Sequence, residues 1–307
     1  MAIVEADSVT EFEELTERFT AWAQQHDDVR GLAVFGSRAR PDGPNDEWSD
    51  LDLIVIATDP ERYLRDETWL AEVARPWVTL VHDAPIPGIE VRQVLFEGAL
   101  DSDIVFLPPS VIGDYAADED MAAVFAQGFR PLVDRDGELA AVAERFTGPA
   151  PSVHPVAPDR ERFEWVVRDF LFQCVYTVKK LARGELWVAK DDCDGYLKRH
   201  LLQMIEWHAA TAGSTRAPFR SDGRYLERWA DPGVLDRLRG AFAGYDEAEV
   251  ARALLATMEL FTDLARATAQ EAGFDYPEAE DRAVTDWVRK HRPHDAGIVL
   301  PAAGPEA

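Results

Sequence analysis

The first half of the chain alternates between short β-branched runs and segments with helical spacing. Apolar residues recur three and four apart from Phe12 to Trp22, and residues 60–75 also have a helical pattern. The short runs predict strands at 31–36, 51–57, 78–82, 89–98 and 103–108. Strands interleaved with helices predict an α/β (α+β) domain with an open, mixed sheet.

In the second half, from Asp159 to about residue 290, apolar positions recur only at intervals of three and four. One stripe runs from Phe163 to Cys174, a second from Leu197 to His208 and a third from Leu254 to Leu264. Such stripes are the buried faces of amphipathic helices. This half is therefore predicted to be an all-α helical bundle.

A proline-rich segment separates the two halves. The sequence GPAPSVHPVAPD at 148–159 contains four prolines, which interrupt any regular element. We therefore predict a first domain at 1–148, a linker at 149–158, a helical domain at 159–291 and a disordered tail at 292–307.

The charge of the chain narrows the choice of partner. Acidic residues outnumber basic ones by 57 to 32, which gives a net charge of −25. Generic nucleic-acid binding depends on clustered lysine and arginine, so no such partner is expected. A polycationic small molecule would suit this surface, although solubility or adaptation to salt would explain the same charge.

No sequence feature points to a membrane or to secretion. No stretch approaches 18 consecutive apolar residues, and the acidic N-terminus lacks a basic segment followed by an apolar one. Cys174 and Cys193 are too few for a disulfide framework. We therefore expect a cytoplasmic monomer or dimer without a membrane partner.

Candidate chemistry begins where the first predicted strand ends. Gly36 and Ser37 follow that strand, and a helix beginning there would offer backbone N–H groups and a hydroxyl to a phosphate. Asp50 and Asp52 lie two apart at the next predicted strand, so they share one face. Paired carboxylates with substrate phosphates are typical ligands of Mg²⁺. The combination predicts metal-assisted transfer on a nucleoside triphosphate.

A third acid, Asp103, opens the predicted strand 103–108. If this strand neighbours 51–57, Asp103 joins Asp50 and Asp52, and the three hold two ions about 3.5–4 Å apart. Asp101 competes for this position, and Glu97 is nearby. We prefer Asp103, because it directly precedes the apolar body of the strand.

Lysine is rare in this chain, yet four of its five lysines lie close together. They are Lys179, Lys180, Lys190 and Lys198. Lysine is a common point-charge ligand of phosphate, so these are candidate triphosphate contacts. An acidic patch beside them would bind ammonium or guanidinium groups or accept a hydroxyl proton. It comprises Asp191, Asp192 and Asp194. A solvated helix face is the alternative explanation for both groups.

Motifs along most of the chain resemble one enzyme family. The Gly-Ser…Asp-x-Asp pattern is the signature of the nucleotidyltransferase superfold. The stretch FGSRARPDGPNDEWSDLDLIV, with Arg38 and Trp48-Ser49, resembles the aminoglycoside 6-adenylyltransferases, which are streptomycin adenylyltransferases. The likeness continues through LDSDIVFLP, PLVDRDGEL, CVYTVKKLARGELWVAKDDCDGYLKRHLLQMIEWH and EAGFDYP, over roughly residues 30–290. Arg40 departs from this pattern, because the family often has Asn there.

That resemblance implies transfer of AMP from ATP, with Mg²⁺ as cofactor, to an aminoglycoside hydroxyl. Streptomycin is the expected drug and antibiotic resistance the expected consequence. It implies that the nucleotide is bound by Gly36, Ser37, Arg38 and Lys179. It implies that metal is held by Asp50, Asp52 and Asp103. Asp191 matches a family acid that meets the drug and acts as base, so the catalytic set is Asp50, Asp52, Asp103 and Asp191.

Two other interpretations stay open at this point. The chain would fit an adenylyltransferase of the same superfold that acts on another small molecule. It would also fit a nucleotide-binding homologue without catalysis, whose expected mark is the loss of a metal acid. All three acids are present in this sequence. A nucleic-acid polymerase is opposed by the net charge of −25.

Overall fold

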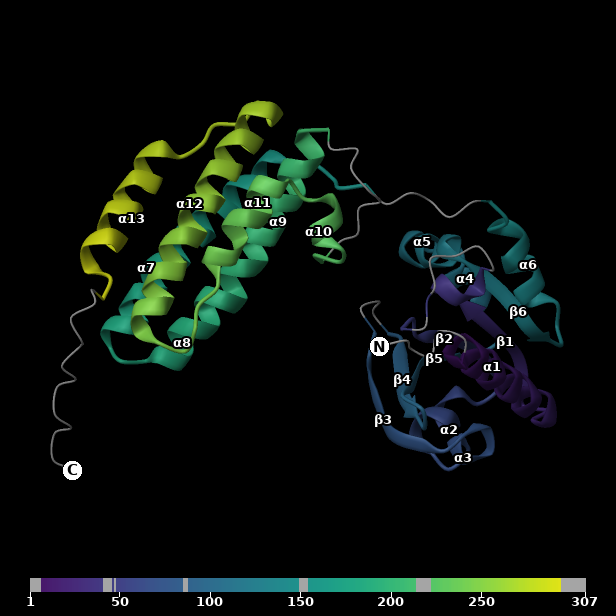
Figure 1. Cartoon of the computed structure of the whole chain (residues 1–307). Coiled ribbons are helices and arrows are strands. Elements are labelled where there is room, and N and C mark those ends of the chain that lie inside the picture. Colours follow the sequence, from purple (N-terminus) through teal and green to yellow (C-terminus); the bar gives the residue numbers. More distant parts are fainter. Residues whose placement is uncertain are drawn as a thin grey trace, which may run out of the picture. The chain divides into compact units, whose positions relative to one another are not determined.

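Figure 1 shows the computed structural model of the chain. It describes residues 7–40, 46, 48–84, 88–148, 154–213 and 222–293. The chain divides into two compact units, Met1–Pro151 and Ser152–Ala307. Most of the expected tail (294–307) and half of the expected linker (149–153) lie outside the described residues, whereas 154–158 have no regular structure.

The first unit is built on a six-stranded sheet. Its strands, in spatial order, are β3 (Pro76–Asp83), β4 (Glu90–Phe96), β5 (Leu100–Leu107), β2 (Leu51–Ala57), β1 (Val29–Phe35) and β6 (Phe129–Asp134). β2 and β5 are parallel, and each of the other neighbouring pairs is antiparallel. The predicted mixed sheet is therefore confirmed, with one strand, β6, that was not predicted.

Helices cover both faces of this sheet. One apolar layer joins one face to α1 (Asp7–Gln25), α2 (Pro60–Arg65) and α3 (Leu70–Val73). The other joins the opposite face to α4 (Ile112–Tyr115), α5 (Glu119–Gln127) and α6 (Glu138–Arg145), which gather on one side of the sheet in Figure 1.

The helix expected over residues 60–75 is divided into α2 and α3. Asp66 ends α2, and its carboxylate accepts hydrogen bonds from the Thr68 backbone N–H (2.9 Å) and hydroxyl (2.8 Å). Aspartate that binds the backbone two residues ahead favours a turn over a helix. The prediction was therefore wrong about one continuous helix and right about helical structure at both ends.

The second unit is an all-α bundle, as predicted. Its helices are α7 (Arg160–Ala182), α8 (Leu186–Asp191), α9 (Leu197–Thr211), α10 (Leu226–Trp229), α11 (Pro232–Leu238), α12 (Glu247–Ala272) and α13 (Glu278–His291). A π-helical turn, η2 (Asp192–Tyr196), joins α8 to α9, and a 3-10 turn, η3 (Arg239–Ala241), follows α11. The predicted stripes form its core, where Phe170 stacks on Phe261 with ring centroids 3.6 Å apart. Among the described helices, none combines the length and hydrophobicity of a membrane span.

Candidate active site

The turn after β1 lies close to the carboxylate of Asp52. It is a 3-10 turn, η1 (Gly36–Ala39), where the sequence predicted the start of a helix. Gly36 has a φ of +73°, in the left-handed region that favours glycine. A Cβ on this residue would lie 2.6 Å from Oδ2 of Asp52. Glycine therefore lets the turn lie against that carboxylate.

The two polar groups of this turn differ in availability. The Gly36 N–H donates to the carbonyl oxygen of Gly128 at 2.9 Å, so it is already engaged. Ser37 is half-buried, and its hydroxyl has no hydrogen-bond partner within the described part of the chain. Of the two residues predicted to bind phosphate, Ser37 has the free donor and Gly36 contributes its conformation.

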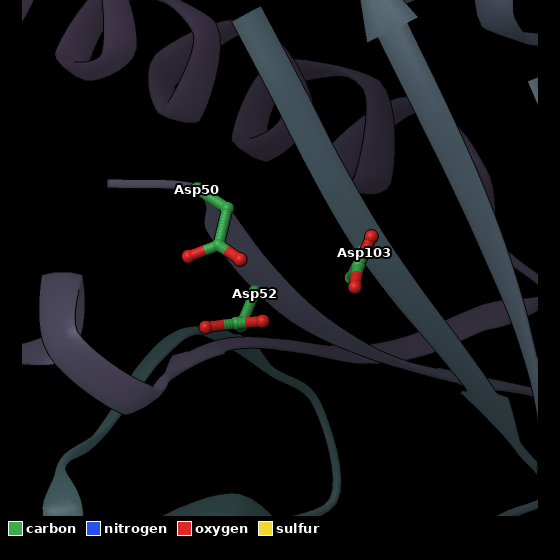
Figure 2. A group of neighbouring side chains, drawn as sticks. All are labelled: Asp50, Asp52 and Asp103. Atoms are coloured by element: carbon green, nitrogen blue, oxygen red, sulfur yellow. The ribbon is translucent and has the colours of Figure 1, made fainter. Parts of the chain in front are cut away.

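Asp50, Asp52 and Asp103 lie close together at the two central strands of the sheet (Figure 2). Asp52 and Asp103 are register partners on the parallel strands β2 and β5, and Asp50 directly precedes β2. One carboxylate oxygen from each lies within 4.8 Å of those of the other two. β5 begins at Leu100 rather than at Asp103, so Asp101 also belongs to this strand.

The electrostatics of this cluster fit a divalent cation. Burial, followed by the charges of Asp50 and Asp103, raises the pKa of Asp52 to about 7. Burial also raises the pKa of Asp103, against a hydrogen bond from Gln93 Nε2 to its Oδ2 at 3.2 Å. Neighbouring carboxylates that disfavour one another's charge are stabilised by a cation with oxygen ligands, and Mg²⁺ prefers such ligands.

Arg38 holds the loop that carries these acids. Its guanidinium donates to the carbonyl oxygens of Asp46 (2.9 Å), Ser49 (2.8 Å) and Asp50 (3.1 Å). It also lies over the ring of Phe12, 3.7 Å from the centroid. Burial lowers the pKa of Arg38 despite the neighbouring acids. The structure thus gives Arg38 a positioning role, and its contact with nucleotide stays a prediction.

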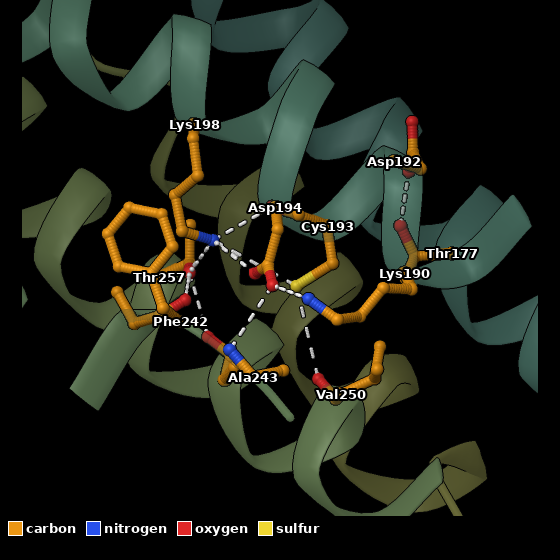
Figure 3. A network of polar contacts seen from close by, with 12 residues as sticks. Thr177, Lys190, Asp192, Cys193, Asp194, Lys198, Phe242, Ala243, Val250 and Thr257 are labelled. Carbon is orange, nitrogen blue, oxygen red and sulfur yellow. Dashed lines mark hydrogen bonds and ion pairs between the residues drawn. The ribbon is translucent and has the colours of Figure 1, made fainter. Parts of the chain in front are cut away.

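Three of the four clustered lysines are used inside the bundle. Lys180 pairs with Glu185 at 2.5 Å, and Lys190 pairs with Asp194. Lys198 is buried and donates to the Cys193 carbonyl and the Thr257 hydroxyl, both at 2.8 Å (Figure 3). Lys179 is exposed, and it has no polar partner among the residues that the structure describes. Of the four, Lys179 therefore remains the candidate ligand for phosphate.

The acidic patch also contains residues that are engaged within the bundle and one that is available to a ligand. Asp192 is buried and accepts a hydrogen bond from Thr177, and burial raises its pKa (Figure 3). Asp194 pairs with Lys190 and accepts from the Ala243 N–H at 3.2 Å. Asp191 is exposed at the end of α8, with no hydrogen-bond or ion-pair partner in the described ranges. Asp191 is thus the patch member that a ligand can reach.

Sequence reasoning missed Gln93 and did not assign Asp101 a role. Gln93 is the register partner of Asp103 on β4, and Leu95 is that of Asp101. The charge of Asp101 contributes to the raised pKa values of Asp52 and Asp103. Gln93 belongs to none of the motifs, and only the register of β4 against β5 brings it to the cluster. Asp101 lies in LDSDIVFLP, two residues before Asp103 on the same strand, and so shares its face.

A cavity of about 380 Å³ lies in the bundle along α11, α12 and α13. Its charged side chains largely satisfy one another, because Arg237 pairs with Asp263 at 2.8 Å and Arg289 with Glu259 at 3.3 Å. It contains none of the predicted site residues. We therefore place the candidate chemistry at the acid cluster.

Comparison with known proteins adds an independent observation. A family model described as streptomycin adenylyltransferase matches residues 10–291. The aminoglycoside 6-adenylyltransferase of Bacillus subtilis is 22% identical over 275 residues, which cover 88% of this chain and 94% of that protein. The enzyme of the same name from Campylobacter jejuni is 20% identical over 275 residues, covering 86% and 90%. The crystal structure of an aminoglycoside 6-adenyltransferase from B. subtilis aligns over 94% of this chain and 98% of its own, at 18% identity and a TM-score of 0.41.

Proposed function

The chain belongs to the streptomycin adenylyltransferase family and is a nucleotidyltransferase, and from this premise we propose that it transfers AMP from Mg-ATP to a hydroxyl of an aminoglycoside, with streptomycin as the first candidate. The observation that carries the proposal is the convergence of Asp50, Asp52 and Asp103 beside the Gly36–Ser37 turn. The names of the curated relatives support the aminoglycoside as acceptor class.

Asp50, Asp52 and Asp103 would hold Mg²⁺, and two ions are proposed because the transfer has both an attacking and a leaving oxygen. Bound there, Mg²⁺ would neutralise charge on the triphosphate and polarise the transferred phosphoryl group. The donor set is made of carboxylate oxygens alone, which supports Mg²⁺ over softer metals.

In the proposed reaction, the acceptor hydroxyl oxygen forms a bond to the α-phosphorus of ATP. The bond between that phosphorus and the oxygen bridging to the β-phosphorus breaks, and pyrophosphate leaves with the electron pair. The hydroxyl proton passes to a carboxylate, for which we propose Asp191. The Ser37 hydroxyl and the Lys179 ammonium are proposed to bind the triphosphate, as the free donor of η1 and the free lysine of α7.

The net charge of the chain also supports this acceptor class. A protein with a net charge of −25 attracts polycationic molecules over a long range, and aminoglycosides are polycationic. We propose that modification of the drug confers resistance. Because ATP is the co-substrate, we propose that the reaction takes place in the cytoplasm.

The test is pyrophosphate release from ATP with streptomycin, a second aminoglycoside, a lincosamide or no acceptor, each with and without Mg²⁺. We expect release with streptomycin that requires Mg²⁺. Asp52→Ala is expected to abolish this release while the circular dichroism spectrum is unchanged. A fully active Asp52→Ala would refute the metal assignment, and release with the lincosamide alone would support the other acceptor class.

A further inference from the structure

The face of the sheet that carries the acid cluster continues beyond it. β2, β5, β4 and β3 are adjacent in this order, and their register aligns side chains in two rows. One row consists of Asp52, Asp103, Gln93 and Leu80. The other consists of Asp101, Leu95 and Val78, with Asp50 just before β2. Register partners lie on the same side of a sheet, so both rows share one surface.

This surface is open because the helices cover only part of the face. Ile54 and Val105, two residues after Asp52 and Asp103, are buried under α4, α5 and α6. Towards the opposite ends of β2 and β5, Asp103, Gln93 and Leu80 of the first row and Asp101, Leu95 and Val78 of the second line a cavity of about 340 Å³ together with Asp50. Val78 and Leu80 on the edge strand β3 are 57% and 48% exposed.

We propose that this cavity binds the acceptor, a polycationic aminoglycoside, and that Asp101 is a specificity-determining residue within it. The residues Val78, Leu80, Gln93, Leu95 and Asp101 are called the acceptor shelf below. This proposal rests on the proposed adenylyl transfer and names where its second substrate lies.

The first argument is the direction of the reaction. The Gly36–Ser37 turn ends β1, and β1 and β5 flank β2 on opposite sides. In an in-line transfer, the attacking and leaving oxygens lie on opposite sides of the phosphorus. With the triphosphate at the turn beside Asp52, the acceptor hydroxyl approaches from the β5 side. The acceptor shelf lies on that side.

The second argument is the charge of the cavity. Its described lining contains Asp50, Asp101 and Asp103 and no basic residue. A triphosphate would be repelled there, whereas ammonium and guanidinium groups would be attracted. Asp101 is exposed and has no hydrogen-bond or ion-pair partner in the described parts of the chain. Its carboxylate is therefore free to pair with a cationic group.

The third argument is the apolar floor. Val78, Leu80 and Leu95 present carbon surface beside the carboxylates, which suits the C–H faces of a sugar or cyclitol ring. Exposed apolar residues on an edge strand favour aggregation, so their placement at this cavity is consistent with a ligand. The Gln93 amide nitrogen donates a hydrogen bond to Asp103 at 3.2 Å. Its carbonyl oxygen can therefore accept a hydrogen bond from a hydroxyl or ammonium group of the aminoglycoside.

The experiment compares Asp101→Asn and Leu80→Ser with wild type. Pyrophosphate release gives KM for streptomycin and for ATP, and calorimetric titration with streptomycin, in Mg²⁺ and α,β-methylene ATP, gives Kd. Losing one charge-assisted contact predicts an increase in streptomycin KM and Kd of about 10- to 100-fold for Asp101→Asn, with the KM for ATP unchanged. Leu80→Ser should raise the same two constants by several-fold.

The matched control is Glu97→Gln, which removes one negative charge at the β4–β5 connection, outside the cavity, where Glu97 faces Arg75 at 3.5 Å. It should leave all constants unchanged, and thermal unfolding should show that each variant is folded. If wild type is active and Asp101→Asn behaves as the control, the acceptor shelf is refuted and the proposed function stands. An increase confined to the KM for ATP would assign the cavity to the nucleotide and overturn the proposal. Absence of turnover by wild type with any aminoglycoside would refute both.

Discussion

At the scale of single residues, Gly36 sets how closely η1 approaches Asp52. Its φ is +73°, and a Cβ would lie 2.6 Å from the Asp52 carboxylate. We expect Gly36→Ala to lose about 1–2 kcal/mol of stability through backbone strain and also to lose adenylyl transfer, because the new methyl group displaces Asp52. Urea unfolding and pyrophosphate release measure the two effects.

Gly137 provides the matched control for this prediction. Its φ is +80°, and a Cβ there would meet nothing within 4 Å. Gly137→Ala should therefore show the same loss of stability with full activity. If both variants keep their activity, the close approach of the turn to Asp52 has no role in the reaction.

The raised pKa of Asp52 predicts that the difference in stability between wild type and Asp52→Asn depends on pH. Burial and the neighbouring acids raise its pKa from 3.8 to about 7 in the folded chain. The folded state therefore binds more protons than the unfolded state between these values, and this residue destabilises the metal-free fold increasingly as pH rises towards 7. We expect Asp52→Asn to be more stable than wild type at pH 8 in EDTA, with a smaller difference at pH 5. Urea unfolding at the two pH values measures this, and an equal difference at both would contradict it.

The sequence pattern was informative for residues within a motif and silent for the others. The spacing of Asp50 and Asp52, together with Asp103 at the predicted strand 103–108, predicted a cluster of three acids, and these acids lie together in the structure. Gln93 reaches that cluster through the register of β4 against β5, which a single sequence does not reveal, whereas Asp101 lies two residues before Asp103 on the same strand and was already a competing candidate. The ion pairs of Lys180, Lys190 and Lys198 join residues only four or five positions apart, but the order of charged residues alone did not show which lysines are paired.

At the scale of elements, the end of α7 holds two adjacent lysines with different surroundings. Lys179 is exposed without a polar partner in the described chain, whereas Lys180 pairs with Glu185 at 2.5 Å. We expect Lys179→Ala to raise the KM for ATP about tenfold, as expected for loss of one charged contact. Thermal unfolding should be unchanged, because nothing in the bundle depends on this side chain.

Lys180→Ala is the control from the same helix. It removes the same charge one position along and should leave the KM for ATP at the wild-type value. Equal KM values for the two variants would show that the free lysine of α7 does not bind nucleotide.

The long helical stripes and the apolar strands were predicted, whereas β6 and the short helices α4, α5 and α6 were not. The buried strands β2 and β5 have continuous apolar runs, whereas β6 contains Arg130 and Pro131 and shows no alternation. Proline is tolerated there because β6 is an edge strand. Asp66 divided the expected helix into α2 and α3 through side-chain hydrogen bonds from Thr68. These bonds favour a turn over a continuous helix, and the spacing of apolar residues does not reveal them.

At the scale of the whole molecule, fold class and family could be inferred from the sequence, because both depend on patterns spread along the chain. The change from alternating strands and helices to helical stripes alone marks two kinds of unit, and the chain divides at Pro151 and Ser152. The family model likewise matches residues 10–291 rather than one motif. A net charge of −25 is a property of the entire chain that favours a cationic acceptor over an anionic one.

The claim on which the account depends is that Asp50, Asp52 and Asp103 hold a divalent cation together with the nucleotide. Electron paramagnetic resonance of Mn²⁺, titrated into the protein with α,β-methylene ATP and compared with the analogue alone, tests this directly. Wild type should retain Mn²⁺ beyond what the analogue holds, and Asp52→Asn should bind it at least about tenfold more weakly. Equal Mn²⁺ binding by wild type and Asp52→Asn would contradict the account.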